Sequence, residues 1–352
     1  MPNSASTDIF YRYKTQNRLK DIETARECFN LFDNNKEGYL DLAKFKIFLS
    51  TLFSYNNKPY TIPEDKIIKI FDLFNIKKDT KLSLQEFEKL WIKLVIPTLC
   101  PKTALIIVDV QNDFISGTMS ISNCPAKQDG FEVVPCINNM IKTIHFDAIA
   151  YTYDWHPEDH CSFIENVDKR KIASGSPIKE NIKVNDIVIF EDYPDIEQKL
   201  WPAHCIQGSH GSELHPSLID IDEKTDEMKR KKINAYKGVK SDIDSYSAFF
   251  DNCKLNETSL NTDLKRHGIN ELYICGLAAD VCVAATCNDA LDLNYRVIYV
   301  EDACRGIVEE DIVNQKEKLA MRNAVIGNSK QVLNMISGRD RRPEHAFVTL
   351  KI

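Results

Sequence analysis

The stretch ICGLAADVCVAATC, residues 274–287, holds three of the chain's eleven cysteines. Cys282 stands where an apolar, strand-like run gives way to a helix-like segment. At such a turn, the unpaired N–H groups and the positive end of the helix dipole stabilise a thiolate and can hold an oxyanion. Cys275 falls inside the strand and Cys287 inside the helix, where free cysteines usually serve packing. The sequence therefore predicts Cys282 as a nucleophile.

A thiol nucleophile also needs a base and a cation nearby. Asp109 lies at the end of the apolar run ALIIVDV, and Lys237 lies in the segment NAYKGVKSDIDSYSAF. Lys240, in the same segment, is the alternative lysine. Because side chains that follow neighbouring parallel strands meet at one edge of a sheet, we expect Asp109, Cys282 and one of these lysines to act together.

Three further residues have the types and spacing of metal ligands. Asp154 and His156 are two residues apart in the segment DWH, and in an extended backbone such residues point to the same side. His204, in the turn-rich segment WPAHCIQGSHGSEL, could supply a third ligand. Two imidazoles and one carboxylate suit a divalent first-row metal, with zinc or iron as the first candidates. The D-x-H pattern also occurs in surface turns, so it does not establish a metal site alone.

Other polar residues near these motifs are interpreted as supporting or solvated groups. Asp113 is expected to fix a loop by hydrogen bonding rather than to act as an acid. Gln111 is expected to support the metal ligands or the loop of Asp109. His160 and His210 lie in polar segments, where histidines are mostly solvated.

Four short runs of β-branched and apolar residues follow Thr103: ALIIVDV, FDAIAYTY, ELYICGLA and YRVIYVED. Helix-like segments lie between several of them, which is typical of buried parallel strands linked by helices. The sequence therefore predicts an α/β fold of three layers, with a doubly wound, mostly parallel sheet and helices on both of its faces. In such folds, ligands bind at the carboxyl ends of the strands.

Residues 20–95 have a different, all-helical character. The segments IETARECFNLF and AKFKIFLSTLF flank the polar loop DNNKEGYLDL, and PEDKIIKIFDLF and QEFEKLWIKLVI flank a second loop. Apolar residues recur at three- and four-residue spacing in these segments, which predicts a pair of EF-hands. Pro97 and Pro101 interrupt the helical pattern, so we expect a helical domain over residues 1–97 and the α/β domain over residues 98–352.

An EF-hand loop binds calcium through oxygen ligands at fixed positions, the last being a bidentate glutamate at position 12. Lys44 occupies that position in the first loop, whereas the second loop has Lys77 at position 3 and Thr80 where glycine is favoured. We therefore expect weak calcium binding at most and interpret this domain as a helical module that packs against the α/β domain or mediates assembly, with calcium sensing as the alternative. Four residues of the first loop keep the types of calcium ligands: Asp33, Asn35, Glu37 and Asp41.

The composition argues against several classes of partner. The 352 residues carry a net charge of −7, which gives no electrostatic reason to expect binding to nucleic acid or anionic membranes. No apolar run approaches about 20 residues, the length of a membrane-spanning helix, and the N-terminus lacks the apolar core of a secretory signal. The odd number of scattered cysteines suits reduced thiols. We expect a cytoplasmic protein, with the nucleus as a second location, that acts on a small molecule as a monomer or a homo-oligomer.

Five motifs together resemble those of nicotinamidases in the isochorismatase-like cysteine hydrolase superfamily. They are VDVQNDF, DWH, WPAHC-x-x-G-x-x-G-x-EL, KG followed by DSYSAF, and GLAADVCV, in the same order and with similar spacing. The resemblance covers about residues 100–310. Only Lys237 precedes a glycine as the family lysine does, so the resemblance favours Lys237 over Lys240.

The resemblance implies a role for each matching residue. Three residues match the family's catalytic aspartate, lysine and cysteine, in that order: Asp109, Lys237 and Cys282. Three match the protein ligands of a divalent metal, usually zinc with iron or manganese as alternatives: Asp154, His156 and His204. Three match aromatic residues around the nicotinamide ring: Phe114, Trp201 and Tyr246. The bond between Leu277 and Ala278 matches a cis peptide that shapes the oxyanion hole together with the N–H of Cys282.

The activity that this resemblance implies is hydrolysis of nicotinamide to nicotinate and ammonia, in NAD salvage. Asp109 would take the thiol proton of Cys282, Lys237 would stabilise the charge, and the reaction would pass through a cysteine thioester. One alternative is another amide hydrolase or other hydrolase of the superfamily, such as a carbamoyl-amide hydrolase or an isochorismatase, although these generally lack the metal motifs. A second alternative is an inactive EF-hand scaffold that keeps the hydrolase fold for binding.

Overall fold

The computed structural model describes residues 8–352, which form two compact units. The first unit comprises the chain up to Pro101 with residues 294–296 and 330–352, and the second comprises residues 102–293 and 297–329. The sequence prediction placed residues 330–352 with the α/β domain. The structure differs because C-terminal side chains, including Ala346 and Phe347, are buried in the hydrophobic core of the first unit. The first seven residues of the predicted helical domain lie outside the described part of the chain.

The first unit contains the predicted EF-hand pair. Helices α2 and α3 flank the first loop, α4 and α5 flank the second, and the two loops pair through the antiparallel strands β1 and β4. The elements of this unit are α1 (Ile9–Thr15), α2 (Ile22–Phe32), β1 (Tyr39–Leu40), α3 (Leu42–Leu52), β2 (Ser54–Tyr55), β3 (Lys58–Pro59), α4 (Glu64–Phe74), β4 (Leu82–Ser83), α5 (Leu84–Leu90), a π-helical turn (Trp91–Val95), α6 (Ile96–Leu99), α12 (Ser329–Ile336) and α13 (Pro343–Leu350).

Capping residues fix where these helices begin. The carboxylate of Asp21 accepts the N–H of Glu23 at the start of α2, with a donor–acceptor distance of 3.0 Å. Asp41 accepts the N–H of Lys44 at the start of α3, at 2.8 Å. Short polar side chains at these positions satisfy N–H groups that have no partner within the helix. Aspartates therefore define where α2 and α3 begin.

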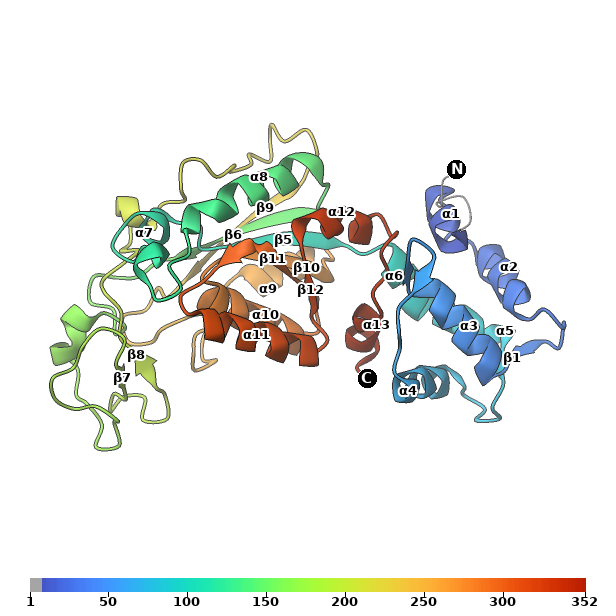
Figure 1. Cartoon of the computed structure of the whole chain (residues 1–352), viewed down its shortest axis with the longest axis horizontal. Coiled ribbons are helices and arrows are strands. Elements are labelled where there is room, and N and C mark those ends of the chain that lie inside the picture. Colours follow the sequence, from blue (N-terminus) through green and yellow to red (C-terminus); the bar gives the residue numbers. More distant parts are fainter. Residues whose placement is uncertain (1–7) are drawn as a thin grey trace. The chain divides into compact units, whose positions relative to one another are not determined.

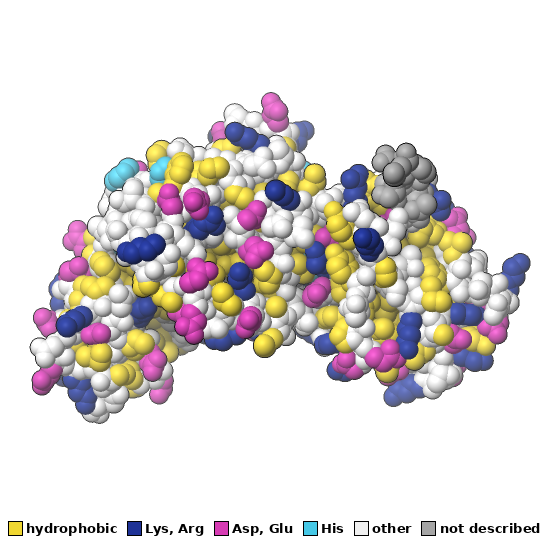
Figure 2. Space-filling view, in the orientation of Figure 1, with side chains coloured by type: hydrophobic (Ala, Val, Ile, Leu, Met, Phe, Trp, Pro, Cys, Tyr) yellow, Lys and Arg dark blue, Asp and Glu magenta, His cyan; other side chains and the backbone are white. Residues whose placement is uncertain are grey.

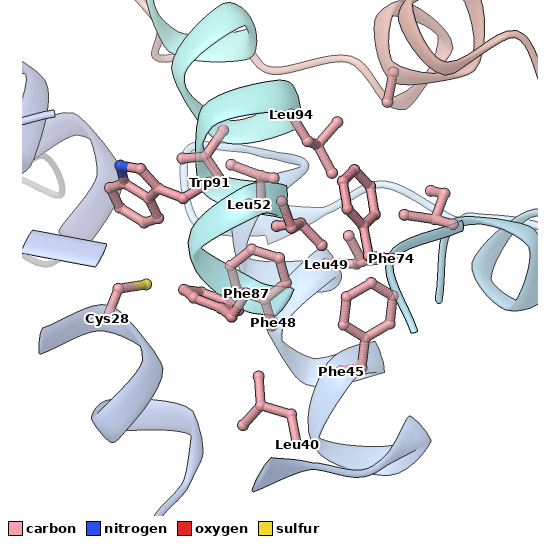
Figure 3. Close-up of a cluster of buried hydrophobic side chains, with 14 of the residues drawn as sticks. Cys28, Leu40, Phe45, Phe48, Leu49, Leu52, Phe74, Phe87, Trp91 and Leu94 are labelled. Atoms are coloured by element: carbon pink, nitrogen blue, oxygen red, sulfur yellow. The ribbon is translucent and has the colours of Figure 1, made fainter. Parts of the chain in front are cut away.

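Aromatic side chains fill the core of the first unit (Figure 3). The rings of Phe48 and Phe87 meet edge to face with centroids 5.1 Å apart, and Phe45 meets Phe71 in the same way at 5.2 Å. The buried indole of Trp91 donates its N–H to a backbone carbonyl at 2.8 Å. Such pairs add about 0.5–1.5 kcal/mol each beyond the burial of apolar surface. The repeated phenylalanines of the helical segments thus explain why the four helices pack into one core.

The second unit has the predicted three-layer α/β fold (Figure 1). Its six-stranded sheet has the order β12-β11-β10-β5-β6-β9, and the pairs β12–β11, β10–β5, β5–β6 and β6–β9 are parallel. Helix α8 covers one face of the sheet, and α10 and α11 cover the other. The four predicted strands are present as β5, β6, β10 and β11. They lie side by side with their apolar side chains buried, as their sequences require.

The elements of the second unit are β5 (Thr103–Val108), α7 (Asn112–Ile115), α8 (Val133–Thr143), β6 (Ala148–Asp154), β7 (Ile187–Val188), β8 (Gln198–Lys199), β9 (Lys231–Lys237), α9 (Leu260–Arg266), β10 (Glu271–Leu277), a π-helical turn (Ala279–Val283), α10 (Ala284–Asp292), β11 (Arg296–Arg305), α11 (Glu309–Met321) and β12 (Val325–Gly327). Short 3₁₀ turns cover Ile121–Asn123, Gly130–Glu132, Ile164–Lys169 and His210–Ser212.

Strands β9 and β12 at the two edges of the sheet were not predicted. In β9, Ile233, Ala235 and Lys237 are buried while Asn234 and Tyr236 are exposed. This alternation arises because one face of β9 is covered by the protein and the other faces solvent, so its sequence, KKINAYK, lacks a continuous apolar run. The edge strand matters for function because it ends at Lys237.

The lengths of the helices and the charges on the surface bear on which environments and partners suit the chain. Within residues 8–352, the helices are too short or too polar to cross a lipid bilayer. On the described part of the face shown in Figure 2, acidic and basic side chains are interspersed. Mixed charges of this kind form no extended basic surface on that face.

Candidate active site

The candidate active site lies at the carboxyl edge of the sheet in the second unit. Asp109 follows β5, Asp154 ends β6 and Lys237 ends β9, so three neighbouring strands bring charged side chains to one edge. Asp154 and Lys237 are direct partners in the β6–β9 register. Cys282 lies after β10, in the π-helical turn that leads into α10. The strand order therefore brings together residues that are far apart in the sequence.

The ammonium of Lys237 is the centre of the cluster. Its Nζ lies 3.0 Å from Oδ2 of Asp109, 2.8 Å from Oδ1 of Asp154 and 3.5 Å from the sulfur of Cys282. It also donates to the carbonyl of Ser245 at 3.1 Å. Lys240, the alternative considered from the sequence, is exposed and bonds to a surface asparagine instead. Of the two lysines, the structure brings only Lys237 to the cysteine.

Burial sets the protonation states of this cluster. Burial lowers the pKa of Lys237, but the charges of Asp109 and Asp154 outweigh it and raise that pKa above its ordinary value. Burial raises the pKa of Asp109, and the nearby charge of Lys237 only partly offsets this. Burial likewise raises the pKa of the Cys282 thiol, against the influence of Lys237. The resting cysteine is therefore a thiol beside an ammonium, and Asp109 is a carboxyl suited to exchange a proton.

The backbone of Asp109 is held in an unusual conformation. Its φ is +50°, in the left-handed region that non-glycine residues rarely adopt. The hydroxyl of Thr152 donates to Oδ1 of Asp109 at 2.5 Å and accepts the N–H of Asp109 at 3.1 Å. These two bonds orient the carboxylate so that Oδ2 faces Lys237.

The three candidate metal ligands converge beside this cluster. Oδ2 of Asp154 lies 3.0 Å from Nε2 of His156 and 3.2 Å from Nε2 of His204, and all three side chains are buried. Nδ1 of His156 lies 3.0 Å from the carbonyl of Gly238, and Nδ1 of His204 lies 2.7 Å from the carbonyl of Pro202. Because a carbonyl only accepts, each ring carries a proton on Nδ1 and can turn an Nε2 lone pair toward the carboxylate. These facing lone pairs and the carboxylate form a donor set that fits a divalent cation.

Two side chains hold the metal-type ligands in place. Gln111 accepts the N–H of Asp154 at 2.9 Å and donates to the carbonyl of the same residue at 2.8 Å. Asp113 accepts the N–H of Cys205, the residue after His204, at 2.7 Å. Both contacts are the supporting hydrogen bonds that the sequence suggested. Gln111 and Asp113 thus fix the backbone at or next to two candidate ligands, Asp154 and His204, that are distant from them in sequence.

A pocket lies next to Cys282 and the metal-type donors. Four residues expected around the substrate line it: Phe114, Trp201, Tyr246 and Ala278. Leu277 is fully buried at the end of β10, and its peptide bond to Ala278 is cis. Within the catalytic trio, Cys282 lines the pocket, whereas Asp109 and Lys237 are 0 and 1% exposed behind it. The aromatic side chains suit a small planar ring held next to the thiol.

Sequence reasoning missed five residues that line the pocket: Met119, Ser162, Asp244, Val281 and Ile307. Val281 belongs to the GLAADVCV motif and adjoins Cys282, so its position was open to inference. Ile307 follows the last buried strand that was predicted, β11, and its place at the carboxyl edge could have been expected. The others lie on loops whose sequences carry no periodic pattern.

The interpretation of His160 as a solvated residue was wrong. Its side chain is 0% exposed, and its ring lies 4.0 Å from the ring of His156. Burial is the main cause that lowers the pKa of His160. Nδ1 of His160 bonds to the hydroxyl of Ser162 at 2.7 Å. His210, interpreted in the same way, has an 81% exposed side chain.

The chain is similar to known families over two regions. Residues 103–331 match the isochorismatase domain, and residues 22–92 match the EF-hand domain pair. A nicotinamidase of Escherichia coli is 36% identical over 211 residues, which cover 59% of this chain and 84% of that protein. The isochorismatase match, residues 103–331, contains the whole candidate site.

Solved structures extend this similarity to the fold. A nicotinamidase and pyrazinamidase of Acinetobacter baumanii superposes with a TM-score of 0.54 at 31% identity, covering 66% of this chain and 98% of that one. Yeast nicotinamidase bound to the inhibitor nicotinaldehyde superposes with a TM-score of 0.50 at 30% identity, covering 64% of this chain and 99% of that one. Each of these proteins is matched over nearly its whole length.

Proposed function

The chain belongs to the isochorismatase domain family, and we propose that it hydrolyses nicotinamide to nicotinate and ammonia in NAD salvage. One observation carries the proposal: the sulfur of Cys282 lies 3.5 Å from Nζ of Lys237 at the wall of an aromatic pocket. The nicotinamidases of Escherichia coli and yeast, to which the chain is similar, support this substrate. The aromatic lining supports a planar ring.

The first step is activation of the thiol. Asp109 takes the proton of Cys282, and the raised pKa of this buried carboxyl makes it a better proton acceptor than an ordinary aspartate. The ammonium of Lys237 stabilises the thiolate that forms, because it lies beside the sulfur. The thiolate then attacks the carboxamide carbon of the substrate.

The second step expels ammonia. Attack places a negative charge on the carboxamide oxygen, and the N–H groups of Ala278 and Cys282 are the proposed donors to that oxyanion. Asp109 returns its proton to the amide nitrogen, so that neutral ammonia leaves when the carbon–nitrogen bond breaks. The product of this step is a thioester on Cys282.

The third step hydrolyses the thioester. Asp109, again a carboxylate, takes a proton from a water molecule, and the hydroxide attacks the thioester carbon. When the carbon–sulfur bond breaks, the proton on Asp109 returns to the sulfur, and the nicotinic acid that forms releases its remaining proton to the solvent as nicotinate. The cluster is then in its resting state, with a thiol beside the ammonium of Lys237.

Asp154, His156 and His204 would hold one divalent metal, with zinc as the first candidate and iron or manganese as alternatives. When bound, such a metal supplies a Lewis acid that can hold a pyridine nitrogen or a water molecule. Asp154 uses its two oxygens differently: Oδ1 faces Lys237 and Oδ2 faces the histidines. The same carboxylate therefore fixes the distance between the catalytic cluster and the metal-type donors.

The test is ammonia release from nicotinamide by Cys282→Ala and by Cys287→Ala. We expect Cys282→Ala to lower kcat/KM by at least about 10⁴-fold, because removing a nucleophile leaves only binding and electrostatic contributions. Cys287→Ala is the matched control, since Cys287 is buried in the body of α10 outside the pocket lining. We expect it to stay within a few-fold of the wild type. A Cys282→Ala protein that releases ammonia at the wild-type rate would contradict the proposal.

A substrate panel separates this function from the alternatives within the family. Nicotinamide is expected to be hydrolysed with a higher kcat/KM than a carbamoyl amide or isochorismate, because the pocket is lined with aromatic rings and metal-type donors. Hydrolysis of the carbamoyl amide alone would overturn the substrate and leave the role of Cys282 standing. No hydrolysis of any of the three would favour a scaffold that has lost its activity.

A further inference from the structure

The first EF-hand loop holds a cation that belongs to the chain itself. Nζ of Lys44, at position 12, lies 2.9 Å from Oδ1 of Asp33 and 2.6 Å from Oε2 of Glu37. It also lies 3.5 Å from the carbonyl of Tyr39. These three residues occupy positions 1, 5 and 7 of the loop, where an EF-hand presents oxygens to calcium. The ammonium therefore contacts the ligand oxygens that a calcium ion would use.

The electrostatics of the loop agree with an internal ion pair. The hydrogen bonds that Lys44 donates to Glu37 and Asp33 raise the pKa of Lys44 above its ordinary value, so it stays charged at neutral pH. Burial raises the pKa of Asp33, but the bonds from Lys44 and from the N–H groups of Gly38 and Glu37 outweigh it and lower that pKa. Both partners are thus held in their charged forms. One of the two negative charges that calcium would meet at Asp33 and Glu37 is thereby already neutralised.

The other candidate ligands of this loop are used differently. Asp41 accepts the N–H of Lys44 and caps α3, and Asn35 is exposed. Within residues 8–352, the clusters that bring three histidine, cysteine or carboxylate donor atoms within 4.8 Å of one another lie in the second unit. The first loop therefore does not fit calcium while Lys44 stands at position 12.

The second loop is closed by hydrogen bonds rather than by an ammonium. Glu86, at position 12, is 4% exposed. Its Oε1 accepts the N–H groups of Ile76 at 2.8 Å and Lys77 at 3.3 Å. Its Oε2 accepts the N–H of Ser83 at 2.9 Å and the hydroxyl of Ser83 at 2.7 Å. The carboxylate that would chelate calcium is already bound on both oxygens, and Lys77 adds a positive charge at position 3.

The far end of α3 is held by a second internal cation. Arg341, 2% exposed, donates to the carbonyl of Leu52 at 2.5 Å and to that of Thr51 at 3.2 Å. These carbonyls close α3, where a cation also interacts favourably with the helix dipole. Its guanidinium donates further to Ser54 Oγ at 2.9 Å and pairs with Asp8 at 2.8 Å. The C-terminal segment thus supplies a structural part of the first EF-hand.

The same segment fills the core of the pair. Ala346 and Phe347 of α13 are buried with the phenylalanines of the EF-hand helices. The hydroxyl of Tyr60, which lies between the two EF-hands in sequence, donates to Asp340 at 2.7 Å. Lys66 of α4 lies over the ring of Phe347, 5.1 Å from its centroid. An EF-hand pair that binds a helix through its apolar core normally does so after calcium binding. Here the helix is part of the same chain and is already bound.

We propose that this EF-hand pair works without calcium: the Lys44 ammonium is the permanent cation of the first loop, and the pair permanently holds the chain's own C-terminal segment. The pair is then a structural clamp for residues 338–352 rather than a sensor. This inference concerns the first unit and is independent of the proposed hydrolase activity.

The test compares the full-length wild type with Lys44→Glu and Lys36→Glu by calorimetric titration with CaCl₂. Lys44→Glu restores a carboxylate at position 12, so we expect it to bind one Ca²⁺ with a Kd between about 10⁻⁶ and 10⁻⁴ M. Lys36→Glu is the matched control, because it makes the same change of charge in the same loop at a position that supplies no ligand. We expect no saturable heat from the wild type or from Lys36→Glu up to about 1 mM Ca²⁺.

Hydrogen exchange of α13 tests whether the EF-hand pair holds the C-terminal segment permanently. This measurement uses the wild type alone, so it does not depend on whether a variant folds. Amide protection of residues 343–350 is expected to be the same with and without Ca²⁺. Saturable Ca²⁺ binding by the wild type, or protection of α13 that depends on Ca²⁺, would overturn the proposal. A folded Lys44→Glu protein that binds Ca²⁺ no better than Lys36→Glu would also overturn it, because Lys44 would then not be what excludes the ion.

Discussion

Each unit of the molecule holds a lysine between two carboxylates, but the two lysines have different surroundings. Lys237 is 1% exposed, joins Asp109 to Asp154 and lies 3.5 Å from a thiol. The side chain of Lys44 is 12% exposed, joins Asp33 to Glu37 and lies in a polar loop. The first ammonium lies behind the pocket wall, beside the thiol that lines it, whereas the second lies among the oxygens of an EF-hand loop.

The difference shows what turns a buried ion pair into a reactive group. At Lys237, burial raises the pKa of Asp109 and of Cys282, so protons can move between groups that lie within reach of a substrate. At Lys44, the pKa of Asp33 is lowered and no nucleophile is near, so the charges are fixed and the contact is structural. One ammonium between two carboxylates therefore has a proposed catalytic role in one setting and a structural role in the other.

Removing the positive charge should separate the two sites most clearly. Lys237→Met is expected to lower kcat for ammonia release by at least about 10³-fold, because the thiolate loses its stabilising charge. It leaves two buried carboxylates unpaired, which should also lower the free energy of unfolding by about 3–5 kcal/mol. Lys44→Met is expected to leave kcat within about twofold of the wild-type value, because Lys44 contacts residues of the EF-hand loop and none of the candidate active site.

Circular dichroism would show that Lys237→Met is still folded at the assay temperature. Lys240→Met is the control for losing a lysine in the same segment, because Lys240 is exposed. A folded Lys237→Met protein with wild-type kcat would remove the distinction between the two lysines. So would a large loss of kcat in Lys44→Met.

A smaller effect on function is expected from Gly238, which positions the candidate metal ligand His156 but is not itself a ligand. Gly238 has a φ of +64°, and a Cβ at this position would lie 2.3 Å from Cε1 and 2.4 Å from Nδ1 of His156. Gly238→Ala must therefore displace the His156 ring and its bond to the Gly238 carbonyl. We expect metal affinity to fall by about 10–100-fold, as for other changes to groups that orient a ligand.

Metal content after dialysis against a graded chelator measures this effect. Gly268→Ala is the matched control: it has a similar φ of +68°, but its added Cβ would meet nothing within 4 Å. Both variants carry the backbone strain of an alanine at positive φ, and only one touches a histidine. Equal metal content in the two variants would mean that His156 is not held by this contact.

The sequence was sufficient for the parts of the site that lie at the ends of buried strands. Asp109 and Cys282 follow apolar runs that are easily identified, and Asp154 with His156 follows another. Lys237 was found from its motif rather than from its strand, because β9 is an edge strand with alternating burial. His160 was misjudged because a polar local sequence does not show that the segment folds inward onto His156.

The C-terminal segment shows the limit of such reasoning in the first unit. No pattern in the sequence indicated α13, and Ala346 and Phe347 of this helix are buried in the core of the EF-hand helices. Arg341, with its buried bonds to α3, was indistinguishable in sequence from a surface arginine. The partners of both are almost 300 residues away along the chain, and no local pattern encodes a contact of that kind.

The smallest expected effect is the acid sensitivity of the EF-hand pair. The folded pKa of Asp33 lies below its ordinary value of about 3.9, so its ion pair with Lys44 stabilises the fold fully above that pH. The stabilisation is lost as the pH falls through the lower pKa of the folded protein, because Asp33 is then protonated.

The wild type should lose more protection of α3 between pH 5 and pH 3 than Lys44→Met, which has no such pair to lose. Hydrogen exchange of residues 42–52 in both proteins at each pH measures this, with Lys46→Met as the control for an exposed pair. Equal acid sensitivity of the wild type and Lys44→Met would mean that the Lys44 contact, unlike that of Lys237, contributes nothing measurable to the fold.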